Sequence, residues 1–317
     1  MEARTSKVSI VGAGAVGATL AYAGLMRGFA RRVALFDVNK AKVEAEALDL
    51  AQGIQFMPEA TVEGSDQVEV CADSDVVVIT AGAKQQPGQS RLDLAGATIG
   101  LMDRILPPLL KVAPHAVYIL VTNPVDVVTF AALRASGMDP RRMFGSGTVL
   151  DSSRLRHQIA QECDVAVANV HAYIAGEHGD SEVALWSSAS IGGVPLSEWH
   201  DAEGRVVMTA EARERIHHDV MRSAYTIIEG KGATNYAIGA AGARIVEAVL
   251  GDQNRVLPVS TLIDYPGVGE VCMSLPAIVG REGVVHRVDV PLDAAESEAL
   301  AASARSIREV AGTFGVE

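Results

Sequence analysis

The stretch that decides the fold is VSIVGAGAVG, residues 8–17, in which a short apolar run leads into three closely spaced glycines. The apolar run predicts a buried strand, and the glycines predict a tight turn that opens a helix. In such a turn Gly12 bends the chain, Gly14 lets a pyrophosphate approach the backbone, and Gly17 lets the helix pack against the strand. The pyrophosphate would rest on the first amides of the helix, beside Val16.

A carboxylate stands where this interpretation requires one. The next apolar run, 33–36, ends at Asp37, and a carboxylate at that point accepts hydrogen bonds from the ribose hydroxyls of a dinucleotide. It also repels a 2′-phosphate, so the pattern favours NAD over NADP. FAD and S-adenosylmethionine sites share parts of the fingerprint, and Asp37 would alternatively cap the helix expected over 40–50. The fingerprint therefore predicts a nucleotide but does not name the reaction.

The order of the remaining elements predicts the fold class. Residues 76–80 and 117–121 are continuous apolar runs, as expected of strands buried on both faces. Strands that alternate with helices predict an α/β fold with a parallel, doubly wound sheet of the Rossmann type. The second half is expected to be mixed, with strands at 167–174, 183–190, 256–262 and 271–275 and helices at 210–229, 234–250 and 292–314. We therefore predict a dinucleotide-binding domain over 1–146 and an α+β substrate domain over 147–317.

Composition narrows the class of partner. The net charge is −12, which disfavours nucleic acid and anionic membranes, so an anionic substrate would be held by a few local arginines. Cys71, Cys163 and Cys272 are scattered and offer neither a disulfide framework nor a metal-binding spacing, which fits a reducing cytosol. No stretch reaches the roughly 20 uninterrupted apolar residues of a membrane span. A cytoplasmic protein is expected.

The reacting groups are expected in two short stretches, DSSR at 151–154 and GEHGD at 176–180. A histidine beside a carboxylate is an acid/base near neutral pH, and an arginine grips a carboxylate through two parallel hydrogen bonds. Residues three apart share a helix face, so Asp151 and Arg154 would face one pocket with His178. This set predicts hydride transfer to or from a small hydroxy acid. A non-catalytic dinucleotide-binding sensor is the alternative, although a sensor needs none of these groups.

Six motifs carry a family resemblance. They occur in order as GAGAVG (12–17), TAG (80–82), QQPGQSR (85–91), TNPV (122–125), GTVLDSSR (147–154) and GEHGDS (176–181). Over almost its whole length the chain resembles the L-lactate dehydrogenases of the lactate/malate dehydrogenase family. The resemblance implies that His178 takes the hydroxyl proton of lactate and returns it to pyruvate, that Asp151 orients the ring, and that Arg154 clamps the substrate carboxylate.

The resemblance assigns further positions to the pocket. Arg91 ends a polar loop expected to close over the substrate, where its guanidinium would polarise the carbonyl. Asn123 would lie beside the carbonyl and the nicotinamide. Gly82 and Thr122 belong to cofactor-binding motifs. The resemblance also places Thr234 in the substrate pocket and Ile238 under the nicotinamide, although as plain sequence Thr234 would serve equally as a helix cap and Ile238 as a core residue.

Gln85 decides which acid is expected. In this family the matching position faces the variable end of the substrate, where glutamine fits beside the methyl group of pyruvate. The malate enzymes place an arginine there, and burying a second carboxylate without that partner would cost roughly 3–5 kcal/mol. The sequence thus favours lactate over malate, with a longer 2-hydroxy acid as a further alternative.

A second site is implied by the bacterial relatives that respond to fructose 1,6-bisphosphate. The positions matching Arg156 and His171 bind the phosphates of that effector in those enzymes. Arg156 lies two residues past Arg154 and so points to nearly the opposite face of a helix. The resemblance also implies a homotetramer. Because the chain lacks the long N-terminal arm of the vertebrate enzymes, assembly is expected to rest on core interfaces.

Overall fold

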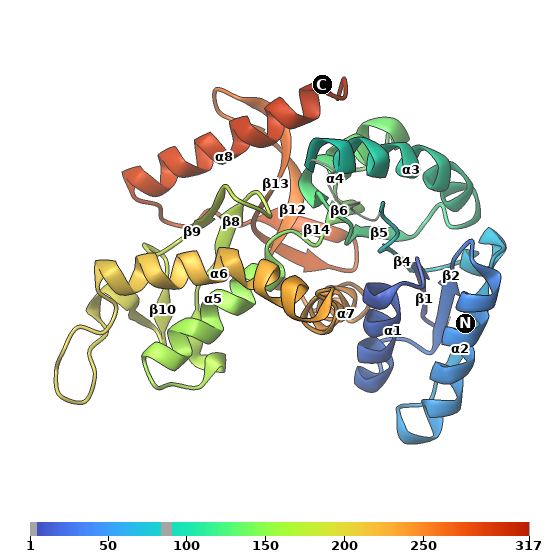
Figure 1. Cartoon of the computed structure of the whole chain (residues 1–317), viewed down its shortest axis with the longest axis horizontal. Coiled ribbons are helices and arrows are strands. Elements are labelled where there is room, and N and C mark those ends of the chain that lie inside the picture. Colours follow the sequence, from blue (N-terminus) through green and yellow to red (C-terminus); the bar gives the residue numbers. More distant parts are fainter. Residues whose placement is uncertain (1–4, 84–90, 317) are drawn as a thin grey trace.

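One large sheet runs through the molecule (Figure 1). The computed structural model describes residues 5–83 and 91–316. Within them the strands follow the order β3-β2-β1-β4-β5-β6-β12-β13-β8-β9, with β14 paired to β13, and β11-β10-β7 form a small separate sheet. The strands from β3 to β6 are parallel to one another. The predicted α/β class with a doubly wound parallel sheet is confirmed.

The first half alternates strands and helices. Its elements are β1 (Lys7–Val11), α1 (Ala15–Arg27), β2 (Arg32–Phe36), α2 (Lys40–Gly53), β3 (Thr61–Ser65), β4 (Val76–Ile79), α3 (Arg91–Val112), β5 (Val117–Leu120), α4 (Val125–Ser136) and β6 (Met143–Gly145). Because β1 pairs with both β2 and β4, the winding reverses at β1. Ligands of such sheets bind outside the carboxyl ends of the strands at this reversal, which is where Gly12 lies.

Two apolar cores lie on the two faces of this sheet. Val77 and Ile79 point into the core beneath α3 and α4, whereas Val76 and Val78 point into the core beneath α1, α2 and α7. Successive side chains of a strand leave opposite faces, so continuous apolar runs are what two covered faces require.

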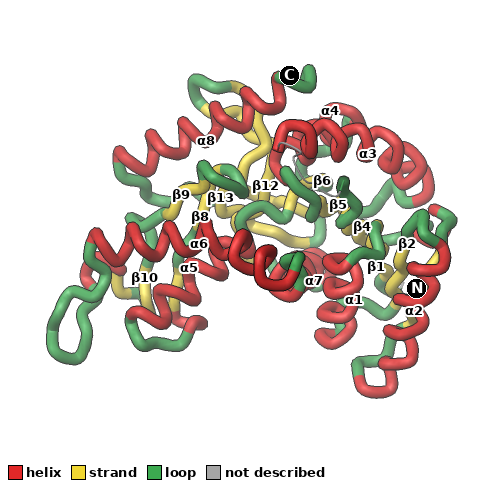
Figure 2. Tube along the Cα trace, in the orientation of Figure 1, coloured by secondary structure: helices red, strands yellow, loops and turns green. Residues whose placement is uncertain are grey.

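The second half is mixed. Its elements are α5 (Val149–Glu162), β7 (Val170–His171), β8 (Ile174–Gly176), β9 (Glu182–Ala184), β10 (Ser190–Ile191), β11 (Val194–Pro195), α6 (Ala210–Lys231), α7 (Tyr236–Leu250), β12 (Arg255–Tyr265), β13 (Gly269–Gly280), β14 (Gly283–Arg287) and α8 (Ala294–Gly312). The predicted boundary at 146/147 falls between β6 and α5. The sheet continues across this boundary, since Gly145 pairs with Ser260. The domain boundary therefore stays a prediction. Figure 2 shows this half as strands of unequal length and long helices, joined by loops.

Two predicted strands are wrong. Residues 167–174 form a 3₁₀ turn followed by β7 and β8, and residues 183–190 form β9, a turn and the first residue of β10. The reason is a change of sheet, because β7 pairs with β10 whereas β8 pairs with β9 and β13. The apolar pattern continues through the segment because each of the two sheets has a buried face. The strands to which the segment is hydrogen-bonded nevertheless change.

Helix α7 joins the two halves by packing on α1. A Cβ on Gly239 would come within 2.7 Å of Thr19 Cγ2, and one on Gly242 within 2.4 Å of Leu20 Cδ1, so two glycines permit this close approach. The Asn235 side chain donates to Thr19 Oγ1 over 3.0 Å. Arg27 at the end of α1 forms a double hydrogen bond with Glu247 of α7.

Candidate active site

The turn between β1 and α1 is shaped for a phosphate group. Gly12 has φ +103°, and a Cβ there would meet the Ala81 backbone at 2.8 Å. A Cβ on Gly17 would lie 1.9 Å from the Gly12 carbonyl oxygen, so only glycine lets the helix sit this close. Gly14 is the N-cap of α1 and makes no side-chain cap bond, and a Cβ on it would meet no atom within 4 Å. Open space before uncapped amides, with Val16 in the first turn, fits the pyrophosphate of NAD.

Asp37 lies at the end of β2 and supports this turn. Its Oδ2 accepts a 2.8 Å hydrogen bond from the Ala13 amide, and its Oδ1 accepts one of 2.9 Å from the Asn39 amide. The cap of α2 is Asn39, whose side chain accepts from Lys42. Asp37 is therefore no helix cap, and its carboxylate lies between the glycine turn and the start of α2, where the ribose of a dinucleotide would lie.

Asp151 joins the two other predicted reacting groups. Its Oδ2 lies 2.5 Å from Nδ1 of His178, and its Oδ1 accepts a 2.7 Å hydrogen bond from Nη1 of Arg154. Asp151 and Arg154 share one face of α5, three residues apart. The side chains of Asp151, Arg154 and His178 are 2%, 12% and 24% exposed, so the imidazole is the most open of the three. The structure thus brings the predicted carboxylate, guanidinium and imidazole into one cluster.

The cluster favours a charged imidazole. Burial opposes the charge, but the charge and hydrogen bond of Asp151, helped by Asp126 and Glu182, raise the pKa of His178 to about 9. Burial also opposes the charge of Asp151, and His178 and Arg154 outweigh it, so the pKa of Asp151 is lowered. A shared pair of this kind holds its proton on the ring and leaves the carboxylate ionised.

Residues at the carboxyl edge of the sheet link the Asp151–Arg154–His178 cluster to the glycine turn between β1 and α1. Thr122 is 6% exposed, and a Cβ on Gly82 would lie 2.0 Å from its hydroxyl oxygen. Asn123 is exposed at the end of β5, before a cis bond to Pro124. Three residues later, Asp126 Oδ2 accepts a 2.7 Å hydrogen bond from the His178 amide. Because that bond holds His178 at the start of α4, His178 lies at the same edge as Asn123.

Thr234 and Ile238 lie at the start of α7, the helix that packs on α1. Thr234 precedes α7 and does not cap it, since the N-cap is Asn235. Its hydroxyl oxygen is enclosed and has no hydrogen-bond partner among residues 5–83 and 91–316. Ile238 is half-buried in the first turn of α7, beside the glycine that touches α1. Gln85 and the side chain of Arg91 lie outside what the structure describes.

Two buried carboxyls of the site escaped the sequence interpretation. Asp126 is 2% exposed and Glu182 is 6% exposed, and both charges act on His178. Burial raises the pKa of Asp126 to about 6, against the opposing effects of Ser260 and the His178 amide. A signal existed for Asp126, because it interrupts an otherwise apolar run at 125–128. A lone charge in such a run needs a buried partner.

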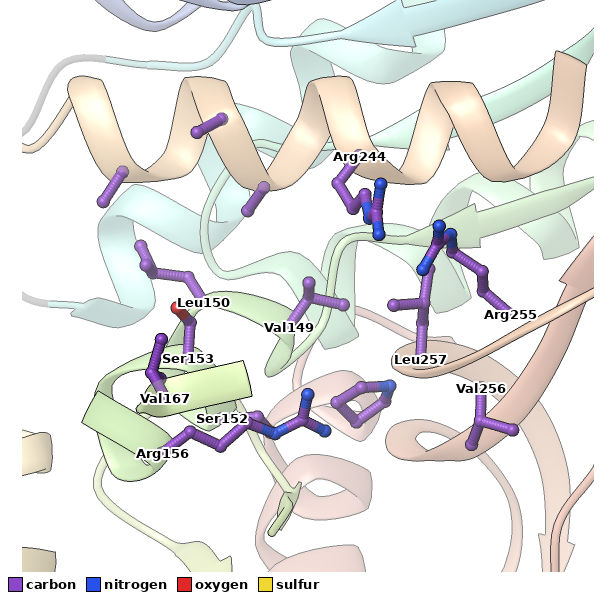
Figure 3. Close-up of a pocket in the computed structure, with 14 residues that line it drawn as sticks. Val149, Leu150, Ser152, Ser153, Arg156, Val167, Arg244, Arg255, Val256 and Leu257 are labelled. Atoms are coloured by element: carbon purple, nitrogen blue, oxygen red, sulfur yellow. The ribbon is translucent and has the colours of Figure 1, made fainter. Parts of the chain in front are cut away.

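The two predicted effector residues lie apart from this cluster. Arg156 donates from Nε to the Ala172 carbonyl over 2.8 Å, and its guanidinium lies 4.9 Å from the Tyr173 ring centroid. His171 is exposed on β7, one residue before Ala172. Arg156 also lines a cavity of about 530 Å³ between α5, α7 and the start of β12, together with Arg244 and Arg255 (Figure 3).

Neither a metal centre nor a membrane-spanning helix is present in the described part of the chain. Across residues 5–83 and 91–316, no cluster of three His, Cys, Asp or Glu side chains is placed to hold a metal ion. In the same ranges, every helix is too short or too polar to cross a lipid bilayer.

The glycine turn, Asp37 and the doubly wound sheet define a dinucleotide-binding protein of the α/β class. Comparison with known families makes this specific. Residues 6–145 match the family model described as lactate/malate dehydrogenase, NAD binding domain, and residues 148–313 match lactate/malate dehydrogenase, alpha/beta C-terminal domain. The chain belongs to the lactate/malate dehydrogenase family, and it is an NAD-dependent oxidoreductase.

Individual relatives agree with this assignment. The chain is 58% identical to an L-lactate dehydrogenase of Bifidobacterium animalis subsp. lactis over 98% of both chains. It is 44% identical to an L-lactate dehydrogenase of a Thermoanaerobacter species, over 96% of this chain and 98% of the relative. Among solved structures, a lactate dehydrogenase from a Medee basin deep-sea metagenome library superposes with a TM-score of 0.94 at 36% identity, over 99% of this chain and 100% of that chain. The minor L-lactate dehydrogenase of Enterococcus mundtii gives a TM-score of 0.93 at 36% identity, over 99% of both chains.

Proposed function

We propose that this protein is an L-lactate dehydrogenase that interconverts lactate and pyruvate in the cytoplasm with NAD as its cofactor. The observation that carries the proposal is the Asp151 carboxylate, which contacts the His178 ring and the Arg154 guanidinium at once. The imidazole can move a proton, and the guanidinium can bind a carboxylate. A 2-hydroxy acid presents a hydroxyl and a carboxylate on adjacent carbons. L-lactate dehydrogenase relatives at 58% and 44% identity support the choice of substrate.

Each protein group has a defined part in the reaction. Arg154 would bind the substrate carboxylate with donors left over from its bond to Asp151, since a guanidinium has five N–H groups. His178 would accept the hydroxyl proton of lactate at Nε2, and Asp151 would stabilise the imidazolium that forms. Bound NAD supplies the hydride acceptor. Asn123 would orient the substrate oxygen, and Arg91 would stabilise negative charge on it.

One assay distinguishes the proposed lactate dehydrogenase activity from the alternative substrates and from a non-catalytic sensor. We expect kcat/KM with NADH to be highest for pyruvate, compared with oxaloacetate and 2-oxoisocaproate, and to be far lower with NADPH because of Asp37. A preference for oxaloacetate or 2-oxoisocaproate would favour a malate or longer-chain enzyme. Tight NADH binding without turnover of any 2-oxo acid would favour the sensor.

Replacing Gln85 by arginine is expected to raise kcat/KM for oxaloacetate by about 100-fold and to lower it for pyruvate. The proposed reason is that an arginine at this position pairs the second carboxylate, which is otherwise buried alone at roughly 3–5 kcal/mol. Steady-state kinetics with both substrates measures the change. Gln86→Arg is the matched control, because it adds the same charge one position further on. An equal gain in both variants would contradict the proposed contact.

We further infer a homotetramer that fructose 1,6-bisphosphate activates. Arg156 and the exposed His171 flank Ala172 on the side of α5 away from Asp151, which suits an anion contact outside the active site. The arginine-lined cavity between α5 and α7 and exposed apolar side chains on α1 and α2, such as Tyr22, Met26 and Leu48, suit subunit interfaces.

The effector is expected to lower KM for pyruvate at least about fivefold, the lower range of allosteric coupling. Arg156→Gln and His171→Gln should each remove most of this effect, whereas Arg215→Gln, which breaks a half-exposed ion pair with Glu162, should retain it. Light scattering with and without the effector reports the subunit number. Saturation curves that do not respond to the effector, or a monomer at assay concentration, would refute these parts of the proposal.

A further inference from the structure

Glu182 closes the loop that carries His178. It is the first residue of β9 and pairs with Gly176, the last residue of β8. Its amide also donates to the Gly179 carbonyl over 3.3 Å. Gly176 has φ +88°, a conformation that favours glycine. The loop is thus fixed at both ends, and Glu182 has a defined position relative to His178.

The Glu182 side chain is buried in a charged environment. It is 6% exposed, and within residues 5–83 and 91–316 its Oε1 is enclosed without a hydrogen-bond partner. An ionised carboxylate in such a place is costly unless nearby cations compensate it. The charged and titratable groups that face it are Asp151 and Arg154 from α5, His178 and Asp180 from the loop, and His217 from α6, which bonds to the Glu182 backbone.

We propose that Glu182 is a positioning residue that switches between a neutral and a charged form beside the Asp151–His178 pair, and so sets how tightly His178 holds its proton at alkaline pH. The inference rests on the proposed lactate/pyruvate reaction. The Asp151 carboxylate opposes the charge on Glu182, whereas the His178 imidazolium favours it. The charge of Glu182 therefore depends on whether His178 is protonated.

The proton affinities fit this role. Burial and the Asp151 charge, opposed by His178 and Arg154, raise the pKa of Glu182 to about 8. Glu182 is then mainly neutral at pH 7 and charged above pH 8. Its charge is one of those that raise the pKa of His178 to about 9. Ionisation of Glu182 thus falls in the range where it delays the loss of the His178 proton.

Glu182→Gln tests the proposal, because glutamine keeps the shape of the neutral form and cannot ionise. At pH 6–7, kcat/KM for pyruvate is expected to match the wild type within about twofold. Near pH 9 it is expected to be about two- to sixfold lower, because lowering a His178 pKa of about 9 by half to one unit reduces the protonated fraction by about that factor at this pH. Lactate oxidation needs neutral His178, so its kcat/KM should rise in the variant near pH 8.

Two further variants separate charge from shape. Glu182→Asp retains an ionisable carboxyl and is expected to restore the wild-type alkaline limb. Glu182→Ser lacks the charge and should reproduce the shift seen with glutamine, which keeps the test open if Glu182→Gln folds poorly. Glu296→Gln is the matched control, because Glu296 is also 6% exposed but caps α8 and accepts from the Ser187 amide. It should lower Tm and leave the pH profile unchanged.

The outcomes are distinct. Wild-type and Glu182→Gln profiles that superimpose from pH 6 to 10 would overturn the inference. A variant slowed equally at every pH would do the same, because it would show a purely structural role. A wild-type protein without turnover of pyruvate or lactate would instead refute the proposed function.

Discussion

Replacing His178 by asparagine is expected to lower kcat for pyruvate reduction by about 10³-fold, within the 10²–10⁴ range of general acid–base catalysis. Asparagine cannot deliver a proton to the carbonyl oxygen, and it leaves the buried Asp151 carboxylate without its 2.5 Å partner. NADH binding should persist, because the glycine turn and Asp37 are untouched. Stopped-flow and steady-state absorbance of NADH measure kcat, and fluorescence titration measures its Kd.

The same assignment predicts the pH dependence. Pyruvate reduction needs protonated His178, whose pKa is raised to about 9, so reduction should fall as pH rises through about 9 while lactate oxidation rises. Because the pKa of His178 is raised from 6.5 to about 9, the pair contributes to the stability of the fold fully below pH 6.5. That contribution is lost as pH rises from there through about 9.

His218→Asn is the control for the His178→Asn variant, because the His218 side chain is 66% exposed on α6. Retention of more than a tenth of the activity in His178→Asn would exclude His178 as the acid/base.

Replacing Arg154 by lysine is expected to raise KM for pyruvate by about 10²–10³-fold. Lysine keeps the charge but is a point donor, so it cannot form two parallel hydrogen bonds to a carboxylate while also bonding to Asp151. Losing two hydrogen bonds between charged groups, at roughly 1.5–2 kcal/mol each, gives this range. The expected signature is a rise in KM with a smaller fall in kcat and no change in the Kd of NADH.

Arg215→Lys is the matched control for that variant. Arg215 lies on α6 and forms a half-exposed ion pair with Glu162, and such surface pairs contribute little. Its KM for pyruvate should stay within about twofold of the wild type. If Arg154→Lys behaves like Arg215→Lys, Arg154 does not bind the substrate carboxylate.

The first half of the fold follows from apolar runs because both faces of its sheet are covered. Strands β4 and β5 are uninterrupted apolar segments in the chain and are fully buried in the structure. Strand β3 carries no such signal, since it lies at the sheet edge with half-exposed side chains. In the second half the pattern fails at Ala172 and Tyr173, where the chain leaves one sheet for another. The apolar pattern of the sequence predicts which residues are buried. It does not predict which strands form hydrogen bonds with one another.

The part of the site that the sequence predicts consists of residues in short motifs. His178, Asp151 and Arg154 were expected together, and the structure places them within one set of hydrogen bonds. Asp126 and Glu182 are not among the predicted residues. The apolar run around Asp126 indicates a buried charge, but the partner of that charge depends on elements distant in the chain. Asp126 meets the His178 amide across 52 residues of sequence. A local pattern holds no information about such a pairing.

The contact of α7 with α1 bears on how this chain can be divided or recombined. One side of the helix that would receive the pyrophosphate packs against α7, whose residues come more than 200 positions later in the chain. A fragment cut near residue 146 would expose the Leu20 side of that helix to solvent and leave Arg27 without Glu247. The nucleotide-binding half is therefore a poor candidate for a transplantable module, and chimaeras in this family should exchange α1 and α7 together.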